Sequence, residues 1–538
     1  MAASVFNTTQ VISVLTNVRN ELANSSLGLN QSLVLIVLLA LTPFFFLRWL
    51  STRKLPPAPP SWPLIGHLHL LGTHAHQSMA VLSKKYAPEG IMYLKFGLKG
   101  GIIVSSPEVA KEIFKKHDLA FSQRPELIVT DLLVTNKHGV GFQQYNASWR
   151  NLRKIFTQEV LSPDRMQYAE GLRANEMDYM VNSIFKDVTR NPKEPVEVNK
   201  YFWVLTINFI SRMVLSKRYF SNNPEEESEE AAEFKYVINE QFFLLGSIFP
   251  ADSFPFLERF DIGGLQKRTK TLLPRFQGIL TKILTERREQ RKQEGDAHVD
   301  VDMVDVLLTN QEKGEITDLN IRGVVWDAFA GGTDTQIVTV EWAMAHIIAD
   351  PKIYETLRSE LDREVGVDRR VTESDIPRLK YLNAIMKETF RLHPPTPLLL
   401  PRETNEACTV AGYYVPPNTR LFVNVWAMGH DPEVWENPLE FRPERFLQPE
   451  LQGVDVQGQH FNLIPFGFGR RICPALAIGM VGVQLGIASL VQGFDWSLPD
   501  GVTAEEMDMS EEPGINIRMA SPLRAVAKPR LEAHLYSS

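Results

Sequence analysis

Residues 466–475 carry the residue types best suited to chemistry in this chain. The segment contains Cys473, one of only two cysteines among 538 residues, together with two glycines and two arginines. Glycines let the backbone turn sharply, and nearby cations and backbone N–H groups favour the thiolate form of a cysteine. A thiolate in such a loop suits a metal ion, and the apolar residues 476–485 would bury one side of a large ligand. The alternative is a small buried cysteine without a chemical function.

A second segment, residues 328–335, reads Ala-Phe-Ala-Gly-Gly-Thr-Asp-Thr within an apolar run that predicts a long, largely buried helix. Each glycine costs about 1 kcal/mol relative to alanine in a helix, so we expect an offsetting feature, such as a helix opened against a flat ligand. Gly331 and Thr335 share one helical face, and Asp334 is costly in apolar surroundings unless it is paired or used. Alone, the pattern favours a helix kink with a paired aspartate; together with the cysteine loop, it favours function.

Four residues of the cysteine loop have the spacing of the haem-ligand loop of the cytochrome P450 monooxygenases, namely Phe466, Gly469, Arg471 and Cys473. The sequence resembles this family from residue 56 to about residue 531, and residues 331–335 are similar to its oxygen-activation segment. Segments such as residues 424–428 resemble the plant A-type microsomal group. Two positions depart from the pattern: Gln336 stands where Thr or Ser is frequent, and Ala475 where Gly is usual.

The resemblance implies haem b with Cys473 as its axial ligand, and it assigns proton relay to dioxygen to Asp334 and Thr335. The two haem propionates require cationic partners. Together with Phe466 and Gly469, the residues implied at the cofactor are Trp149, Arg153, Arg402 and Arg471. A triad that supports the fold without doing chemistry is implied at Glu388, Arg391 and Arg445.

Two of these assignments, the cofactor contact of Arg402 and the iron ligand Cys473, have alternatives. For Arg402, an ordinary surface arginine is the alternative. His393 is a conceivable iron ligand, but it precedes two prolines and the thiolate is the better ligand.

The implied activity inserts one oxygen atom of O2 into a small apolar or phenolic substrate, such as a plant phenylpropanoid, flavonoid or terpenoid. Electrons would come from an NADPH-dependent flavoprotein reductase, with cytochrome b5 as a further partner, since no nucleotide-binding glycine loop is evident. By analogy, five segments would contact substrate: the loop after Arg124 and residues 242–256, 325–329, 396–400 and 514–515. A reductase-independent isomerase or dehydratase of the same family, and a haem-binding sensor or electron carrier, are the alternatives.

The elements that must position these residues are predicted to be mainly helical, with a smaller β portion. Apolar residues recur with a period near 3.6 over residues 145–395, residues 91–105 predict a hairpin, and Pro107 begins a short amphipathic helix. Strand candidates return at residues 409–414 and 420–425. The resemblance implies the cytochrome P450 fold, here preceded by a single N-terminal transmembrane helix.

The apolar residues 33–50 are just long enough to form a retained membrane anchor. A cleaved signal peptide is the alternative, but no basic segment closely precedes the run and no small-residue cleavage site follows it. Basic residues follow the run, which places the body of the protein in the cytosol, and the resemblance indicates the endoplasmic reticulum membrane. The predicted order is a luminal segment (residues 1–32, with sequons at Asn7, Asn24 and Asn30), an anchor (33–50), a basic and proline-rich hinge (51–63) and a catalytic domain (64–538).

Composition narrows the remaining possibilities. The net charge of -7 argues against general nucleic-acid binding, which requires a basic face. Two cysteines cannot build a disulfide framework, and they fit a reducing compartment. We expect the acidic residues 225–230 and the mixed-charge residues 286–292 to be solvated surface rather than docking patches.

Overall fold

The computed structural model describes residues 55–133, 138–222, 228–247 and 249–537. The chain divides into two units, Met1–Leu55 and Pro56–Ser538, and the fold and site below belong to the second. The predicted luminal segment and anchor lie outside the described residues, so both stay predictions. Within the described ranges, one helix is long and apolar enough to cross a membrane, α17 (Leu476–Gly493), and most of it is buried inside the unit.

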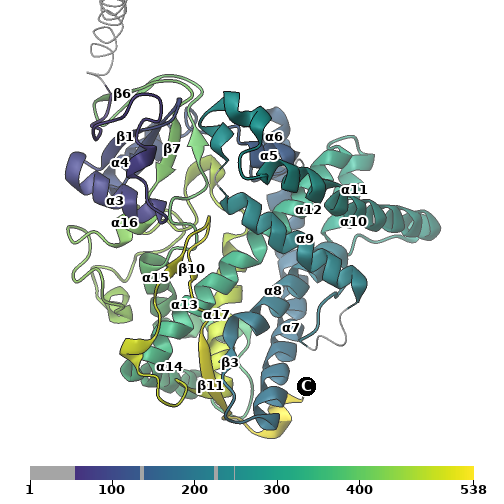
Figure 1. Cartoon of the computed structure of the whole chain (residues 1–538). Coiled ribbons are helices and arrows are strands. Elements are labelled where there is room, and N and C mark those ends of the chain that lie inside the picture. The colour runs from purple at the N-terminus through teal and green to yellow at the C-terminus, as the bar shows by residue number, and fades with distance from the viewer. Residues whose placement is uncertain (1–54, 134–137, 223–227, 248, 538) are drawn as a thin grey trace, which may run out of the picture. The chain divides into compact units, whose positions relative to one another are not determined.

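Helices make up most of the second unit, which confirms the predicted fold class (Figure 1). Besides α17, the described helices are α3 (Ala75–Tyr86), α4 (Pro107–Lys116), α5 (Ile128–Leu132), α6 (Ala147–Ile155), α7 (Pro163–Arg190), α8 (Val198–Leu215), α9 (Glu229–Gly246), α10 (Leu265–Glu294), α11 (Met303–Glu312), α12 (Asp318–Gly332), α13 (Asp334–Ala349), α14 (Pro351–Glu364), α15 (Lys380–Leu392) and α16 (Val425–Gly429). The strands are β1 (Ile91–Phe96), β2 (Lys99–Val104), β3 (Val196–Glu197), β4 (Arg402–Glu403), β5 (Cys408–Val410), β6 (Tyr413–Val415), β7 (Arg420–Val423), β8 (Phe494–Ser497), β9 (Glu511–Glu512), β10 (Arg518–Met519) and β11 (Arg524–Pro529).

The largest sheet has the strand order β1-β2-β7-β4. The predicted hairpin is confirmed, since β1 and β2 pair antiparallel with Ile91 opposite Val104, whereas β2 and β7 run parallel. Helix α4 follows β2 directly, and the Ser106 hydroxyl caps it by accepting the N–H groups of Glu108 and Val109. The proline-rich residues 56–59 lie against this sheet, because the Tyr93 N–H donates to the Pro57 carbonyl at 2.8 Å.

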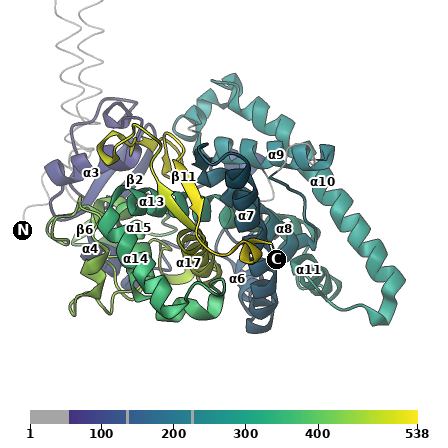
Figure 2. The ribbon, with the colours of Figure 1, turned by 90° about the horizontal axis from the view of Figure 1, so that it is seen from below.

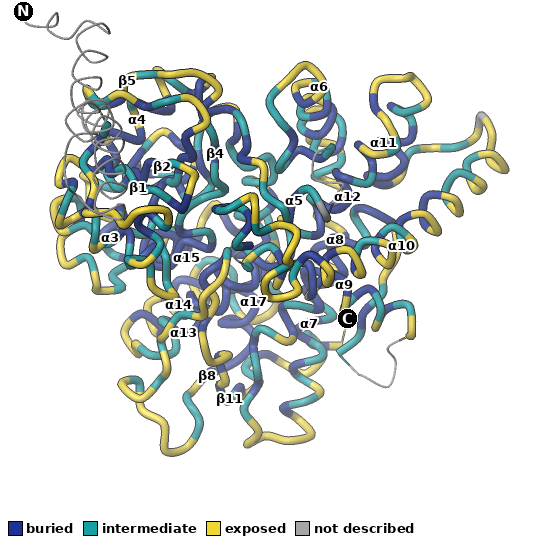
Figure 3. Tube along the Cα trace, turned by 45° about the horizontal axis from the view of Figure 1, so that its top comes forward, coloured by how far each residue is buried: buried dark blue, intermediate teal, exposed yellow. Residues whose placement is uncertain are grey.

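The core of the unit lies where α13, α15 and α17 pack together (Figure 1). These helices are dark along most of their length in the burial view (Figure 3). Trp342 on α13 and Leu490 on α17 are fully buried. A helix that is apolar on all sides belongs in such a core, which explains why α17 passes a hydropathy test for membrane helices. The segment around Cys473 is thereby joined to a helix that is largely buried in the core.

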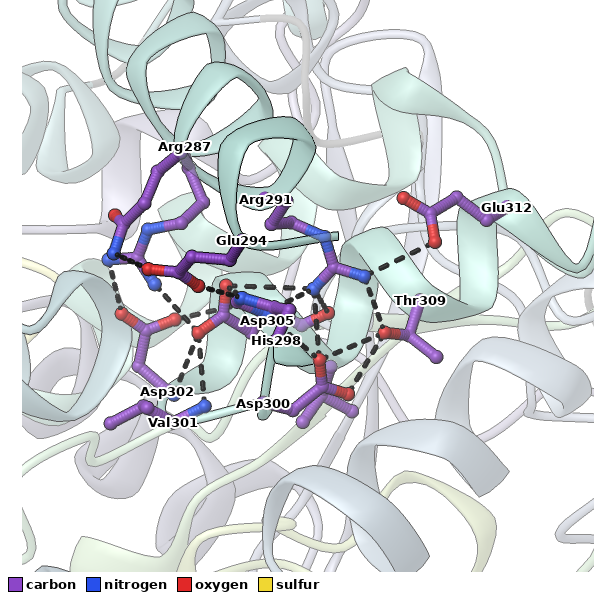
Figure 4. Close-up of polar contacts among 12 residues, drawn as sticks. Arg287, Arg291, Glu294, His298, Asp300, Val301, Asp302, Asp305, Thr309 and Glu312 are labelled. Atoms are coloured by element: carbon purple, nitrogen blue, oxygen red, sulfur yellow. Dashed lines mark hydrogen bonds and ion pairs between the residues drawn. The ribbon is translucent and has the colours of Figure 1, made fainter. Parts of the chain in front are cut away.

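Helix α10 lies at the edge of the unit beside α9 (Figure 2), and its last turns correct one expectation. We call Arg287 and Arg291 the helix arginines. They reach toward acidic residues of the following loop and of α11 (Figure 4), rather than into solvent. Arg287 pairs with Asp302 at 2.8 Å and with Asp305 at 2.7 Å. Residues four apart share a helical face, so part of the run 286–292 is an internal ion-pair surface.

Candidate functional site

The cysteine loop is a tight turn that only glycine could form. Gly467 and Gly469 have φ values of 71° and 70°, in the left-handed region that side chains disfavour. A Cβ on Gly469 would lie 2.4 Å from a carboxylate oxygen of Asp118. The Cys473 N–H donates to the Phe466 carbonyl at 3.0 Å and closes the loop. The structure therefore uses Phe466 and Gly469 to shape the turn that presents the thiol.

Cys473 lies deep in the unit, yet its side chain is only half-buried. Burial raises the pKa of its thiol, while the Ala475 N–H and the nearby Arg153 guanidinium act in the opposite direction. The other cysteine, Cys408, lies on β5, where burial and Glu406 raise its pKa to about 11. Cys473 is thus the cysteine with thiolate-stabilising neighbours.

Four arginines lie around this loop, and we call them the loop arginines: Arg124, Arg153, Arg402 and Arg471. Arg153 donates to the carbonyl of Ile472, the residue before Cys473, at 2.7 Å. Arg402 donates to the Phe468 carbonyl and, at 2.9 Å, to Asp118. Because Arg402 is buried by these contacts, it is not an ordinary surface arginine.

Arg471 and Arg124 direct their donors at backbone carbonyls. Arg471 bonds to the carbonyls of Ser122 and Gln143 at 2.9 and 2.6 Å. Arg124 donates to three further carbonyls, those of Gly141, Leu400 and Pro401, at 2.8–2.9 Å. Carbonyls satisfy the hydrogen-bonding capacity of a guanidinium group but leave its charge uncompensated.

Burial lowers the pKa of every loop arginine. Like charges add to this effect: Arg402 and Arg153, after burial itself, lower the pKa of Arg471 to about 9. After burial, Arg471 and Arg402 likewise lower the pKa of Arg124. Mutual depression of this kind shows that cations are held together with too little negative charge between them.

Two carboxylates accompany these cations. Asp118 is shared, since Arg402 binds one of its oxygens and the exposed Arg470 binds the other at 2.8 Å. Asp327 on α12 accepts the N–H groups of Val140 and Gly141, at 2.5 and 3.0 Å, and burial raises its pKa to about 7. Four cations against these two acids leave a deficit that the propionates of a haem would fill. The chain therefore fits the cofactor that the resemblance implies.

Trp149 supports this group from α6, where Asn146 caps the helix and places Trp149 one turn before Arg153. The indole N–H of Trp149 donates to the Val140 carbonyl at 2.9 Å, and the Arg471 guanidinium lies 4.3 Å from its ring centroid. The indole N–H of Trp149 is thus already hydrogen-bonded within the chain, and the indole ring packs against the Arg471 guanidinium. Direct contact of Trp149 with the cofactor stays a prediction.

On the other side of the loop, the predicted long helix is broken into α12 and α13 at Thr333. Gly331 is exposed although it lies between buried segments, and a Cβ on it would meet nothing within 4 Å. Thr335, on the same face, is half-exposed, and its hydroxyl donates to the Gly331 carbonyl at 2.9 Å. Ala330 before the break and Ala475 after the cysteine pack against one apolar cluster, so the open face and the thiol lie in one region.

The Asp334 side chain has different partners from the Thr335 side chain. Its carboxylate accepts hydrogen bonds from Arg518 on β10 and from Asn516, and it is buried. It lines a cavity of about 300 Å³ between α8, α9 and α13, together with Glu341. The aspartate is therefore paired, as expected for a carboxylate in such surroundings, and its part in proton relay stays a prediction.

Glu388, Arg391 and Arg445 meet in a fully buried network. Arg391 binds both oxygens of Glu388 at 2.7 and 2.8 Å, and Arg445 adds a third bond at 2.9 Å. The remaining donors of the two arginines bond to backbone carbonyls, and one of these is the carbonyl of Gly429. Residue 429 must be small, because a Cβ there would lie 2.0 Å from the Arg391 carbonyl oxygen. The geometry is that of the predicted structural triad.

His393 has a setting unlike that of an iron ligand. It stacks on Trp342 with ring centroids 3.8 Å apart, and its Nε2 bonds His346 at 2.9 Å. Burial lowers its pKa well below the ordinary value. The ring is a packed, neutral part of the core.

Three of the five predicted substrate segments meet in one apolar cluster, which contains Val129, Leu244, Val325 and Phe329. The other two are tied to each other, because the Thr396 hydroxyl bonds Asn516 at 3.0 Å, next to residues 514–515. Gly514 and Ile515 also approach Gly246 at the end of α9. The five segments therefore form two groups, and the second group touches the first at the end of α9.

The half-buried thiol in its glycine turn, the helix broken at Thr333 and the arginines around the loop are the parts expected of a haem-thiolate site. The chain belongs to the cytochrome P450 family of monooxygenases, whose model, described as Cytochrome P450, matches residues 56–521.

Flavonoid 3',5'-hydroxylase of Campanula medium is 38% identical over 94% of this chain and 98% of the relative. Flavonoid 3'-monooxygenase of Petunia hybrida is 39% identical over 91% and 95%, and xanthotoxin 5-hydroxylase of Arabidopsis thaliana is 38% identical over 92% and 97%. A zebra fish cytochrome P450 solved with progesterone has a TM-score of 0.71 at 25% identity, covering 85% of this chain and 99% of that one. These relatives confirm the predicted family and its plant A-type group.

Two residues of the site escaped prediction from sequence. Arg124 was expected only to precede a substrate loop, and Asp327 lay inside a substrate segment without a role of its own. Neither belongs to a motif, and each meets its partners across more than 15 residues of chain. The signal that could have found Asp327 is a lone carboxylate in an apolar helix.

Proposed function

We propose that this monooxygenase hydroxylates a plant phenolic of the flavonoid type. The observation that supports this is the similarity to relatives named for flavonoid hydroxylation, at 38–39% identity over more than nine-tenths of the chain. The xanthotoxin 5-hydroxylase matches to a similar extent, so xanthotoxin belongs among the test substrates. Terpenoids and other phenylpropanoids are the remaining candidates.

The apolar cluster around α12 suits such a substrate. Phe329 and Phe234 stack edge to face, with ring centroids 5.0 Å apart, beside Val325 and Leu244. Aromatic and aliphatic walls with few polar groups are typical of sites for small aromatic ligands. These apolar side chains would orient the aromatic ring of the substrate, and the half-exposed Thr335 would lie beside the substrate where the reaction takes place.

When bound, haem ligated by a thiolate supplies the reductive activation of dioxygen. In our proposal Cys473 Sγ binds the iron, and the loop arginines hold the propionates. Gly331 leaves room for the opposite face, where a side chain would intrude. The triad of Glu388, Arg391 and Arg445 fixes the fold behind the loop and does no chemistry.

Proton supply is assigned to Asp334 and Thr335. The Thr335 hydroxyl reaches the open face, whereas Asp334 is held by Arg518. Asp334 must therefore exchange its bond to Arg518 for a water molecule before it can pass a proton inward. Because Arg518 is about half-exposed, this exchange needs no movement of the core.

We further propose an anchored protein of the endoplasmic reticulum, with residues 1–32 in the lumen, 33–50 in the membrane, 51–63 as hinge and 64–538 in the cytosol. An NADPH-dependent reductase, or cytochrome b5, would dock near the cysteine loop. Exposed cations lie there on α4, on α6 and in the loop itself, at Lys115, Lys116, Arg150, Lys154 and Arg470. Such a face attracts an acidic partner.

The test is reconstitution of the full chain with reductase and NADPH against flavonoids, xanthotoxin, phenylpropanoids, terpenoids and fatty acids. We expect a spectral shift on titration with a flavonoid, which needs no NADPH, and a hydroxylated flavonoid product that is absent without NADPH. Turnover of terpenoids alone would refute the substrate assignment. Product formed without reductase would favour an isomerase or dehydratase, and binding without product would favour a sensor.

A further inference from the structure

Side chains replace the helical hydrogen bonds at the break between α12 and α13. The carbonyls that end a helix have no backbone partner four residues later. Here the Thr333 hydroxyl donates to the Phe329 carbonyl at 3.0 Å and the Thr335 hydroxyl to the Gly331 carbonyl at 2.9 Å. The Gly332 carbonyl receives its donor from Gln336, whose Nε2 lies 2.7 Å away.

Gln336 differs from the two threonines because it also contacts another helix. Its side chain is buried, and its Oε1 lies where a Cβ on Gly482 of α17 would be, 2.0 Å from that position. A hydroxyl at residue 336 would be too short to fill this space. The amide group is therefore wedged between the broken helix and the helix that follows Cys473.

We propose that Gln336, seated on Gly482, is a positioning residue that holds the helix break open and thereby sets the Thr335 hydroxyl. The Gln336 amide gives the Gly332 carbonyl a partner in place of the backbone N–H of residue 336, so the open helical ladder leaves that carbonyl satisfied. The Thr335 hydroxyl then keeps the Gly331 carbonyl and stays on the open face. This inference rests on the proposed function of Thr335 in proton supply.

The first test measures the break itself in the haem-loaded full chain. Gln336→Met keeps the length of the side chain but removes the donor. The Gly332 carbonyl then loses its partner, and the donor that replaces it in a continuous helix is the backbone N–H of residue 336. We expect amide hydrogen exchange of residues 334–336 to slow at least tenfold, as in a continuous helix. Unchanged or faster exchange would overturn the inference.

The second test measures coupling, the amount of hydroxylated product formed per NADPH oxidised. In Gln336→Met we expect coupling to fall at least threefold while hydrogen peroxide rises, with the reduced carbon monoxide spectrum unchanged. Gly482→Ala, which displaces the amide without altering Gln336, should give the same shift. Wild-type coupling in both variants would refute the positioning of Thr335, even if exchange had slowed.

A matched control separates this effect from ordinary stability. Thr206 on α8 is buried and donates to the Phe202 carbonyl four residues earlier in an unbroken helix. Thr206→Val should leave both exchange at 334–336 and coupling unchanged; a similar uncoupling there would overturn the inference. Failure of the wild type to turn over any substrate would instead refute the proposed function, and the exchange result would still decide whether Gln336 holds the break.

Discussion

Two groups of arginines in this chain differ in how their charge is compensated. Burial alone would lower the pKa of the helix arginines, but the carboxylates around them raise it, those of Asp302 and Asp305 for Arg287 and those of Asp300 and Glu312 for Arg291. The loop arginines donate mainly to backbone carbonyls, and burial lowers their pKa. The helix arginines thus lie among carboxylates, whereas Arg402 is the one loop arginine that forms an ion pair with a carboxylate in the described part of the chain, that of Asp118.

The difference separates arginines that build the fold from arginines that await a ligand. A buried cation without a matching anion costs free energy, and a chain keeps such a group where an anion from outside completes it. The triad of Glu388, Arg391 and Arg445 lies between the two groups: a carboxylate lies at its centre but serves two arginines, and burial lowers the pKa of Arg445. In our proposal, the shortage of carboxylates around the loop arginines is what marks them for the cofactor.

The largest expected effect comes from substituting Cys473, the proposed iron ligand in the loop that the loop arginines surround. Cys473→Ser should abolish the red-shifted Soret band of the reduced carbon monoxide complex, because the thiolate is lost. The measurement is a difference spectrum of the purified full chain.

Cys408→Ser is the matched control and should keep the band, since Cys408 lies on β5 in another apolar cluster. Retention of the band in Cys473→Ser would mean that another residue binds the iron. The proposal that the loop arginines hold the haem propionates would then be refuted as well.

The second effect is on stability and concerns the helix arginines. Arg291→Met leaves Asp300 without its guanidinium partner, whereas Asp305 keeps Arg287. We expect the free energy of unfolding to fall by about 2–3 kcal/mol, less than for a fully buried pair, with haem affinity unchanged. Denaturant unfolding followed by tryptophan fluorescence measures the first and haem titration the second.

Lys217→Met provides the comparison for that change, because Lys217 and Glu286 form an exposed pair at 2.7 Å. Its unfolding midpoint should hardly move. An equal loss in both variants would show that the network on α10 is no stronger than a surface pair.

The sequence sufficed for the residues that act within short motifs. Cys473 and its glycines, the break at residues 331–335 and the pair Glu388–Arg391 each lie within a few positions, where local geometry dictates contact. Helix and strand predictions near residues 91–116 were confirmed for the same reason, since caps and turns are local.

What could not be predicted depends on contacts across the chain. Glu360 belongs to the charged helix α14, yet it is buried and accepts the N–H groups of Tyr381 and Leu382, at the start of α15. No periodicity reveals which helix end a side chain will reach. The charge deficit of the loop arginines is likewise a property of the assembled site, since their carbonyl partners are distant in sequence.

A third, smaller effect tests the charge deficit directly. Arg402→Met removes one loop arginine while Asp118 keeps Arg470 as its partner. We expect haem affinity to fall about tenfold, or about 1.4 kcal/mol, and the stability of the cofactor-free chain to change less. Haem transfer to apomyoglobin measures the affinity. If Arg291→Met weakened haem binding as much, the distinction between the two groups would be lost.

The smallest effect distinguishes the acids of the two groups by their pH dependence. Burial raises the pKa of Asp327, beside the loop arginines, from 3.8 to about 7. Between these values the folded chain keeps a proton that the unfolded chain has released, so this carboxyl makes stability fall as pH rises, by up to about 1 kcal/mol per pH unit. Asp305 differs: burial raises its pKa, but the Val301 N–H and Arg287 lower it further, to a net value below 3.8. Its contribution is present above pH 4 and is lost only in more acidic solution.

Asp327→Asn should therefore flatten the stability profile between pH 5 and 7, whereas Asp305→Asn should leave the slope in that window unchanged. Unfolding midpoints measured at half-unit steps of pH check both variants. The asparagine amide oxygen can still accept from Val140 and Gly141, so the loop should stay in place. A slope that survives in Asp327→Asn would assign the titration to another group, with Glu341 as the next candidate, because burial raises its pKa to about 7 as well. In that case Asp327 would stay ionised across this window and would compensate the charge of one of the four loop arginines.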